Sequence, residues 1–355
     1  MRTKEPVSAQ FSAGKNLPYP PSFIDRFIWF IQRLPIPYWL TYLLLFTLQG
    51  ALNLVLGWLD GWVPAYTFNS LMFLFPIWQW IPLAAITYLN NISATTLSSF
   101  HPLLDVDEDT YQQLKDEFTT MPRRGVILSG MIWVAIYVLI TTLTFDTFYI
   151  GYGLGITLMW FVILEGLIAF ITGGVIYYHS IRQLQLVNRT VKQVKRFNLF
   201  HLDPVYAFSQ LTARTGILWM LLLGLTLLAF PLDLASLLTI AMLVGQVVLA
   251  LAAFVLPLRS VNQRLVSEKR SLLAANQQRI ETTLTQLHQR IDQKDTGEIG
   301  QINDALAGLN TERDILAKIS TLPFSTNTLR GFLSAIVLPI ALLLVQISIQ
   351  KWLDG

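Results

Sequence analysis

The sequence predicts an all-α integral membrane protein with about seven transmembrane helices and a cytoplasmic, antiparallel, coiled-coil-like helical hairpin. Three observations favour this fold class. Hydrophobic residues make up 53% of the chain and charged residues 13%, about half of the charged fraction in a soluble domain. The basic residues lie in alternate connections between apolar segments. One long connection is polar and carries apolar residues at heptad spacing.

The apolar segments define the predicted spans. A helix needs about 20 mostly apolar residues to cross a bilayer. The segments that meet this requirement lie at about 38–58, 68–89, 126–146, 153–177, 215–232, 236–257 and 329–350. Pro76 and Pro82 interrupt the second segment. We expect one kinked span there and keep a re-entrant segment as the alternative, because membrane helices tolerate proline where neighbours satisfy the backbone.

The Lys and Arg residues predict the orientation. All but one of the 25 lie in the N-terminal segment or in the connections 90–125, 178–214 and 258–330, and Lys351 is the exception. The three other connections contain no basic residue. Because basic residues stay on the cytoplasmic side, we expect a cytoplasmic N-terminus and an outside C-terminus in a bacterial plasma (inner) membrane.

This orientation divides the chain into four parts. They are a cytoplasmic tail at 1–37, spans one to six at 38–257, a cytoplasmic helical hairpin at 258–328, and the last span with the outside C-terminus at 329–355. Two further cytoplasmic segments, 90–125 and 178–214, connect the spans. Within the tail, the pattern of 22–34 predicts an interfacial amphipathic helix with Asp25 on its polar side.

Polar side chains inside the predicted spans form the first candidate site. Glu165 lies near the middle of the fourth span, where inserting a charged carboxylate costs at least about 2.5 kcal/mol. The side chains expected to share its environment are Gln49, Asn53, Gln246 and Thr172. Two hypotheses stay open. One is a polar track that handles a proton or a cation, and the other is interhelical hydrogen bonding with a neutral Glu165.

The polar connection forms the second candidate site. An apolar column recurs at every seventh residue of its first helix, at Val266, Leu273, Ile280 and Leu287. The pattern resumes in a second helix at 299–319. The columns are interrupted at Arg270, Gln277 and Arg313. We expect these three residues to mark a seam that contacts a partner, either a second copy of the chain or a cytoplasmic protein. The alternative is a spacer that closes on itself.

Other chemistry finds little support in the sequence. The absence of cysteine excludes disulfides and thiolate nucleophiles, and the four histidines lack metal-ligand spacing. We find no nucleotide-binding or hydrolase motif, so we expect no catalytic residue, no metal, no cofactor and no enzyme. The acidic run 105–109 fits a helix N-terminus better than a calcium loop. The expected partners are the lipid bilayer and protein at 258–320, and not nucleic acid.

The second half of the chain resembles an uncharacterised family of bacterial polytopic membrane proteins. The resembling stretches are 204-PVYAFSQLTARTG-216, 265-LVSEKRSLL-273 and 322-LPFSTNTLRGFLSAIVLPI-340. The resemblance implies a polytopic fold and assigns no role to any residue. From the residues alone we predict an assembly, scaffold or signal-relay role through the hairpin. The alternative is a transporter or channel that works around Glu165.

Overall fold

The computed structural model describes residues 19–104, 106–146, 153–194, 197–229, 237–293, 297 and 299–354. Regular structure in these ranges is helical, apart from one isolated β-bridge between Pro21 and Pro122. The helices are α1 (Phe23–Arg33), α2 (Tyr38–Leu59), α3 (Ser70–Leu74), α4 (Ile77–Phe100), the 3-10 helix η2 (His101–Leu103), α5 (Glu108–Thr119), α6 (Arg123–Phe145), α7 (Ile156–Gln193), α8 (Asp203–Ala229), α9 (Leu237–Asp292), α10 (Ile299–Lys318) and α11 (Thr326–Asp354). The all-α expectation is therefore confirmed for the described part of the chain.

Six helical segments among the described residues are long and apolar enough to cross a membrane. They belong to α2, α3 with α4, α6, α7, α8 and α9. Their outer faces expose large apolar side chains, and Leu48, Leu143 and Ile156 are each at least 70% exposed. Contiguous apolar surface of this kind is typical of contact with lipid. The predicted seventh span coincides with α11, many of whose C-terminal side chains lie outside the described residues.

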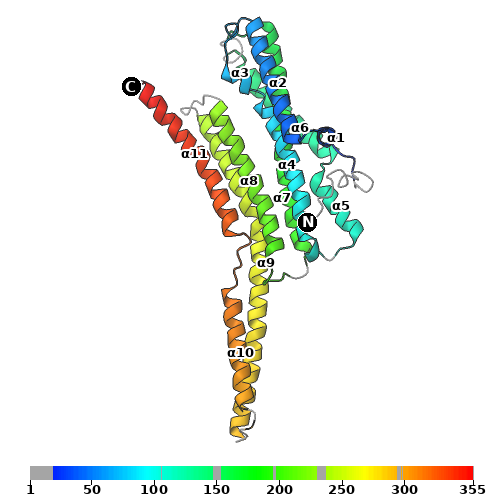
Figure 1. The fold of residues 1–355 in the computed structure, drawn as a ribbon, viewed down its shortest axis with the longest axis vertical. Helices are drawn as coiled ribbons and strands as arrows, with labels where there is room; N and C mark the ends of the chain where they lie inside the picture. The colour runs from blue at the N-terminus through cyan, green and yellow to red at the C-terminus, as the bar shows by residue number, and fades with distance from the viewer. Residues whose placement is uncertain are drawn as a thin grey trace.

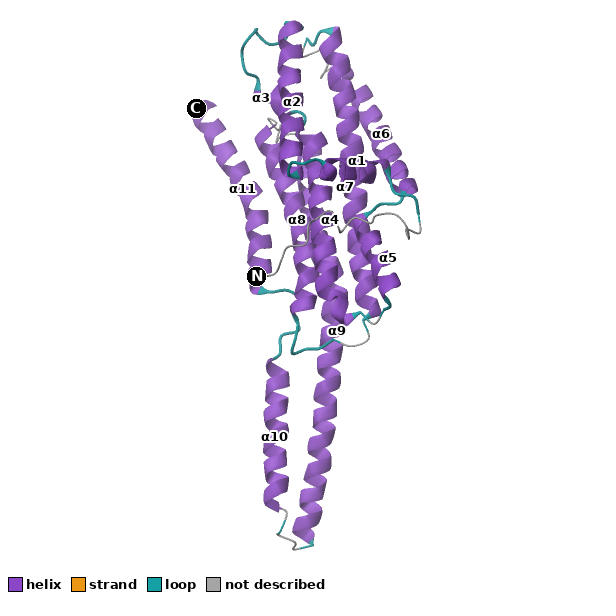
Figure 2. Ribbon diagram, turned by 45° about the vertical axis from the view of Figure 1, so that its right-hand side comes forward, coloured by secondary structure: helices purple, strands orange, loops and turns teal. Residues whose placement is uncertain are grey.

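The molecule is elongated, with a helical bundle at one end and a two-helix projection at the other (Figure 1). Helix α4 packs against α7 and α8, and α6 covers another side of α7. Helix α8 in turn packs against α9 and α11. Helix α10 runs back along the second half of α9 (Figure 2). We call this projection, residues 266–292 together with α10, the arm.

The second predicted span is divided at Pro76. Helix α3 ends at Leu74 and α4 begins at Ile77, with Pro76 as its N-cap residue. Pro82 lies inside α4, one turn further on. The break follows from proline chemistry, because proline has no backbone N–H and its ring clashes with the preceding turn. Residues 70–103 still qualify together as one candidate span, as expected for a kinked helix.

Helix α1 is anchored by a residue that the sequence analysis placed on the wrong side. Asp25 was expected on the polar side, but its side chain is buried. Its Oδ2 accepts hydrogen bonds from the Ser22 hydroxyl at 2.7 Å and from the Met121 amide at 3.0 Å. Burial raises the pKa of Asp25 above its ordinary value, and these hydrogen bonds oppose the rise. The carboxyl therefore links α1 to the turn between α5 and α6.

Helix α5 begins at the acidic run, as the sequence predicts. Asp107 is its N-cap residue and accepts a hydrogen bond from the Thr110 hydroxyl at 2.5 Å. Acidic side chains at this end interact favourably with the partial positive charge of the helix terminus. Asp105 lies outside the described residues. The other end of α5 packs into an apolar cluster, in which the rings of Phe100 and Phe208 lie 4.2 Å apart.

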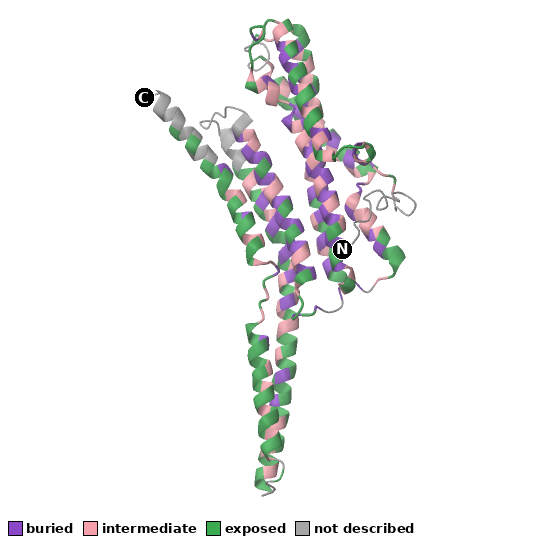
Figure 3. Cartoon of the chain, viewed as in Figure 1, coloured by how far each residue is buried: buried purple, intermediate pink, exposed green. Residues whose placement is uncertain are grey.

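Helix α9 is continuous from the bundle into the arm. It runs for 56 residues and passes Pro257 without ending, although the sequence analysis divided a span from a hairpin at this point. Its buried side chains are concentrated in the bundle half, whereas the arm is mostly exposed (Figure 3). A single helix therefore joins a candidate membrane span to a solvent-exposed projection.

The contact between α6 and α7 gives a test of the fold. A Cβ atom on Gly174 would overlap the Trp133 side chain of α6, whereas Gly173 has open space around the same position. We predict that Gly174→Ala lowers the free energy of unfolding by about 1–3 kcal/mol through overpacking. Gly173→Ala should raise it by up to about 1 kcal/mol, because alanine is the better helix former. Thermal unfolding of both variants in one detergent measures the difference, and equal shifts would contradict this packing.

Candidate functional site

Glu165 is buried between helices at 2% exposure, although it is the ionisable residue of a predicted span. Its Oε2 accepts a hydrogen bond from the Asn53 side-chain amide at 2.9 Å. Its Oε1 accepts a second hydrogen bond from the Gln49 side-chain amide. Both donors lie on α2, one helical turn apart. The structure therefore brings together three of the residues that the sequence analysis selected.

Helix α4 adds two side chains that the sequence analysis missed. The Gln79 amide donates to the backbone carbonyl of Glu165 at 2.8 Å, and its Oε1 accepts from Gln49 at 2.8 Å. The Trp80 indole N–H donates to Gln49 Oε1 at 2.7 Å. Gln79 is the lone side-chain amide of the apolar stretch 71–86, and that isolation was the available signal. We call these five residues the Glu165 cluster.

The other two selected residues lie apart from the carboxyl group of Glu165. The Thr172 hydroxyl lies 2.9 Å from the backbone carbonyl of Trp78, so it joins α7 to α4 two turns away. Gln246 of α9 lies beside Tyr177 of α7. Among the described residues, no hydrogen bond joins Gln246 to Glu165, so the last member of the track of Glu165, Gln49, Asn53 and Gln246 stays a prediction.

The Glu165 cluster satisfies a carboxyl group with neutral donors. Each carboxyl oxygen has an amide partner, and hydrogen bonds to a charged group contribute about 1.5–3 kcal/mol. In the described part of the chain, no charged side chain acts on Glu165. Gln49 and Trp80 are half-buried, so they form the more exposed edge of the cluster. Asn53 Oδ1 is buried and has no hydrogen-bond partner within the described ranges. Such a site can stabilise a carboxylate, and it can also hold a proton or a small cation.

The arm forms the second site, and its seam differs from the prediction by one residue. The apolar column of α9 faces α10 as expected, with Ile280 buried. The second column of the seam is Lys269, Asn276, Thr283 and Arg290. Arg270, Gln277 and Arg313, the residues predicted to contact a partner, are exposed, and their contact with a partner stays a prediction. Gln277 bonds Glu281 along its own helix at 3.3 Å, and Arg313 lies 3.8 Å from Asp314.

Polar contacts fix the register of the arm. The Asn276 amide donates to Glu312 Oε2 at 2.9 Å and to the Leu309 carbonyl at 3.2 Å. The Lys269 ammonium donates to the carbonyls of Ala317 and Ile319 at 2.7 Å each, at the C-terminal end of α10. Helix carbonyls at this end lack intrahelical partners, so a lysine satisfies them well.

Comparisons with known proteins add no candidate. No family model, no curated protein and no solved structure matches this chain. Among the described residues, no group of His, Asp or Glu side chains is arranged to hold a metal ion. The functional argument therefore depends on the Glu165 cluster, the arm and the cavities of the chain itself.

Replacing Glu165 tests whether its carboxyl group is the hydrogen-bond partner that the amide donors of the cluster require. We predict that Glu165→Leu destabilises the fold by about 1–3 kcal/mol for each amide donor that it leaves unpartnered. Glu165→Gln should cost less, because it keeps one oxygen acceptor. The matched control is Glu281→Leu on the exposed arm, which should change stability by at most about 0.5 kcal/mol. Thermal unfolding in detergent ranks the three variants, and a harmless Glu165→Leu would refute the arrangement.

Proposed function

We propose that this chain is a seven-span protein of a bacterial plasma membrane that assembles with, or relays a state to, another protein through a cytoplasmic arm. The positively charged residues support a cytoplasmic location of the arm, because nearly all of them lie in the N-terminal segment and in connections on the same side as the arm. The sequence of helices also supports it, since the arm lies between the sixth and the proposed seventh span, α11.

The observation that carries the proposal is the continuity of α9. At 1.5 Å for each residue, its segment 266–292 extends about 40 Å beyond the bundle. Such a length far exceeds what a connection between two spans requires. A continuous helix also transmits a tilt or a displacement of its membrane half to the tip of the arm. This geometry favours contact with something distant from the membrane surface.

The outer face of the arm supports contact with protein. Leu284 and Ile291 lie on one stripe of α9 at heptad spacing, and they are 38% and 51% exposed. Arg270 and Gln277 continue the stripe toward the bundle. Helix α10 leaves this stripe uncovered, and a helix from another chain could pack against it as in a three- or four-helix coiled coil.

The role of the stripe in assembly can be tested by introducing charged residues into it. We predict that Leu284→Lys combined with Ile291→Lys weakens assembly at least about tenfold, because it removes two apolar contacts. The matched control is Gln286→Lys with Gln293→Lys, which adds the same charge on the opposite face. Cross-linking of the purified protein detects a second copy, and cross-linking in native membranes detects a different protein. Unchanged assembly in the stripe variant, or no assembly of the intact chain in either setting, would refute the proposal.

The Glu165 cluster favours a second candidate function, a transporter or channel for protons or cations. The observation that supports it is a carboxyl group without a charged partner among the described residues, which half-buried Gln49 bonds and which Trp80 approaches through Gln49. We predict that Glu165→Gln abolishes ion flux into liposomes that contain the purified protein, while the variant keeps its fold. Glu281→Gln on the arm is the control for charge. Equal flux through the intact protein and the Glu165→Gln variant would exclude this function.

A further inference from the structure

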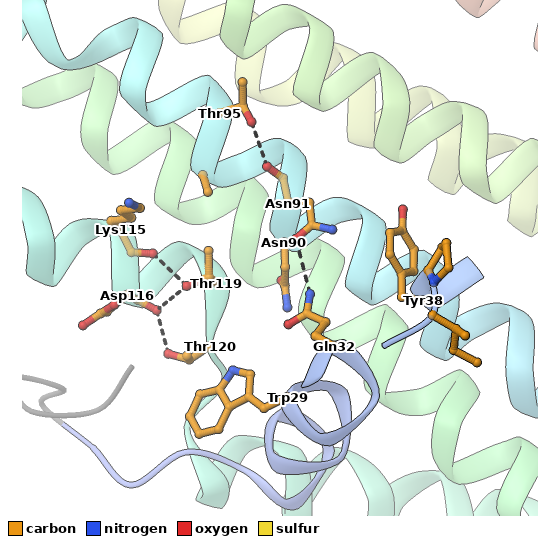
Figure 4. A pocket seen from close by; sticks show the side chains of 13 residues that line it. Trp29, Gln32, Tyr38, Asn90, Asn91, Thr95, Lys115, Asp116, Thr119 and Thr120 are labelled. Atoms are coloured by element: carbon orange, nitrogen blue, oxygen red, sulfur yellow. Dashed lines mark hydrogen bonds between the residues drawn. The ribbon is translucent and has the colours of Figure 1, made fainter. Parts of the chain in front are cut away.

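A cavity of about 440 Å³ lies between α1, the start of α2, α4 and α5 (Figure 4). Its volume falls in the range typical of small-molecule sites. It is separate from the Glu165 cluster and from the arm, because none of their residues lines it. Apolar atoms form much of its surface, and its polar groups are amides from α1 and α4, hydroxyls from α4 and α5, and the charged side chains of α5.

In the described part of the chain, the Gln32 amide group uses only one of its polar atoms. Its N–H donates to Asn91 Oδ1 at 3.4 Å, which leaves Gln32 Oε1 as an acceptor. Within the described residues, Gln32 Oε1 is buried and has no hydrogen-bond partner. The wall formed by α1 therefore offers an unused acceptor.

Asn90 supplies a second unused acceptor from α4. Its side chain is 6% exposed and lines the cavity, and its Oδ1 has no partner among the described residues. A buried polar atom without a partner costs free energy. Two such acceptors on adjoining walls of one cavity are complementary to a ligand that donates several hydrogen bonds.

Charged and aromatic residues complete the lining. Lys115 and Asp116 come from α5, on the side away from Tyr38 in Figure 4. Burial raises the pKa of Asp116, and the neighbouring Lys115 opposes this rise. Trp29 of α1 adds an aromatic face, which attracts organic cations. One cation and one anion at the same wall are complementary to a ligand that carries both charges.

We propose that this cavity binds a primary ammonium group linked to a phosphate, as in the ethanolamine headgroup of a membrane phospholipid. The ammonium donates to Gln32 Oε1 and Asn90 Oδ1 beside Trp29, and the phosphate is attracted by Lys115. The cavity lies beside α1, whose amphipathic sequence favours the membrane surface, where headgroups are found. This inference depends on the membrane location of the chain and not on its assembly or transport role.

A comparison of two lipids tests the contribution of the ammonium N–H groups to binding. Phosphatidylethanolamine and phosphatidylcholine with the same acyl chains carry the same charges, but choline has three methyl groups in place of the N–H donors. We expect the full-length protein in detergent to retain phosphatidylethanolamine about tenfold more strongly, as measured by native mass spectrometry, because two charge-assisted hydrogen bonds are lost with choline. Equal retention of both lipids would overturn the proposal.

Variants assign the preference to the cavity. Gln32→Leu on α1 and Asn90→Leu on α4 should each reduce the preference for the ethanolamine lipid, and Gln32, being half-buried, offers the variant with less risk to folding. Lys115→Gln should weaken the binding of both lipids and keep the preference for the ethanolamine lipid, since both lipids contain phosphate. Gln277→Leu on the exposed arm is the matched control and should change neither. A preference that survives in both cavity variants would overturn the proposed site.

A competition experiment identifies the source of the ligand. Free phosphoethanolamine is added to the complex with the lipid, and phosphocholine serves as the control. If free phosphoethanolamine displaces the lipid at comparable concentration, a soluble phosphoamine is the ligand. If the lipid stays bound, the headgroup needs its acyl chains and the ligand is the phospholipid. Either result supports the ammonium site, whereas displacement by phosphocholine to the same extent would overturn it.

Discussion

The bundle depends on hydrogen bonds to a buried carboxyl group that has no charged partner among the described residues. Glu165 of α7 can remain buried because two amide groups of α2 bond its carboxyl oxygens, while the Gln79 amide of α4 bonds its backbone carbonyl. These contacts fix the register of three helices at once. Gly50 permits α2 to lie close to α3, since a Cβ atom at this position would overlap the backbone carbonyl of Phe73 in α3. The glycine beside Gln49 is thus as much a part of the arrangement as the donors.

A different principle organises the arm. Its seam has one apolar column and one polar column, so burial of apolar surface contributes less than in a leucine-rich coiled coil. Asn276 and Lys269 instead bind specific groups of α10, and these contacts are satisfied in one register alone. Polar residues in a seam often determine register at the expense of stability. A pair held in this way is well suited to accept another helix on its uncovered stripe.

The sequence predicted the contacts that depend on helical periodicity, and it missed the contacts that depend on which helices become neighbours. Asn53 lies one turn from Gln49, so their common face was visible, and the burial of Glu165 followed from the cost of charge in a membrane. Gln79 escaped because its partner, the Glu165 carbonyl, belongs to another helix. The second column of the seam was placed at Arg270 and Gln277, one residue away from Lys269 and Asn276, because the groups that Asn276 binds belong to the other helix, α10. Asp25 was misplaced because its partner, the Met121 amide, is distant in sequence.

Gln246 belongs to a contact that connects α7 with α8 and α9. It lies beside Tyr177, which belongs to the same helix, α7, as Glu165. The Tyr177 ring also lies 4.2 Å from the ring of Trp219 on α8. Helices α8 and α9 therefore both contact α7 at one residue, and α9 continues into the arm. Arg264 of α9 also donates to the Val191 carbonyl near the C-terminal end of α7, so a displacement of α7 acts on α9 at two places before α9 enters the arm.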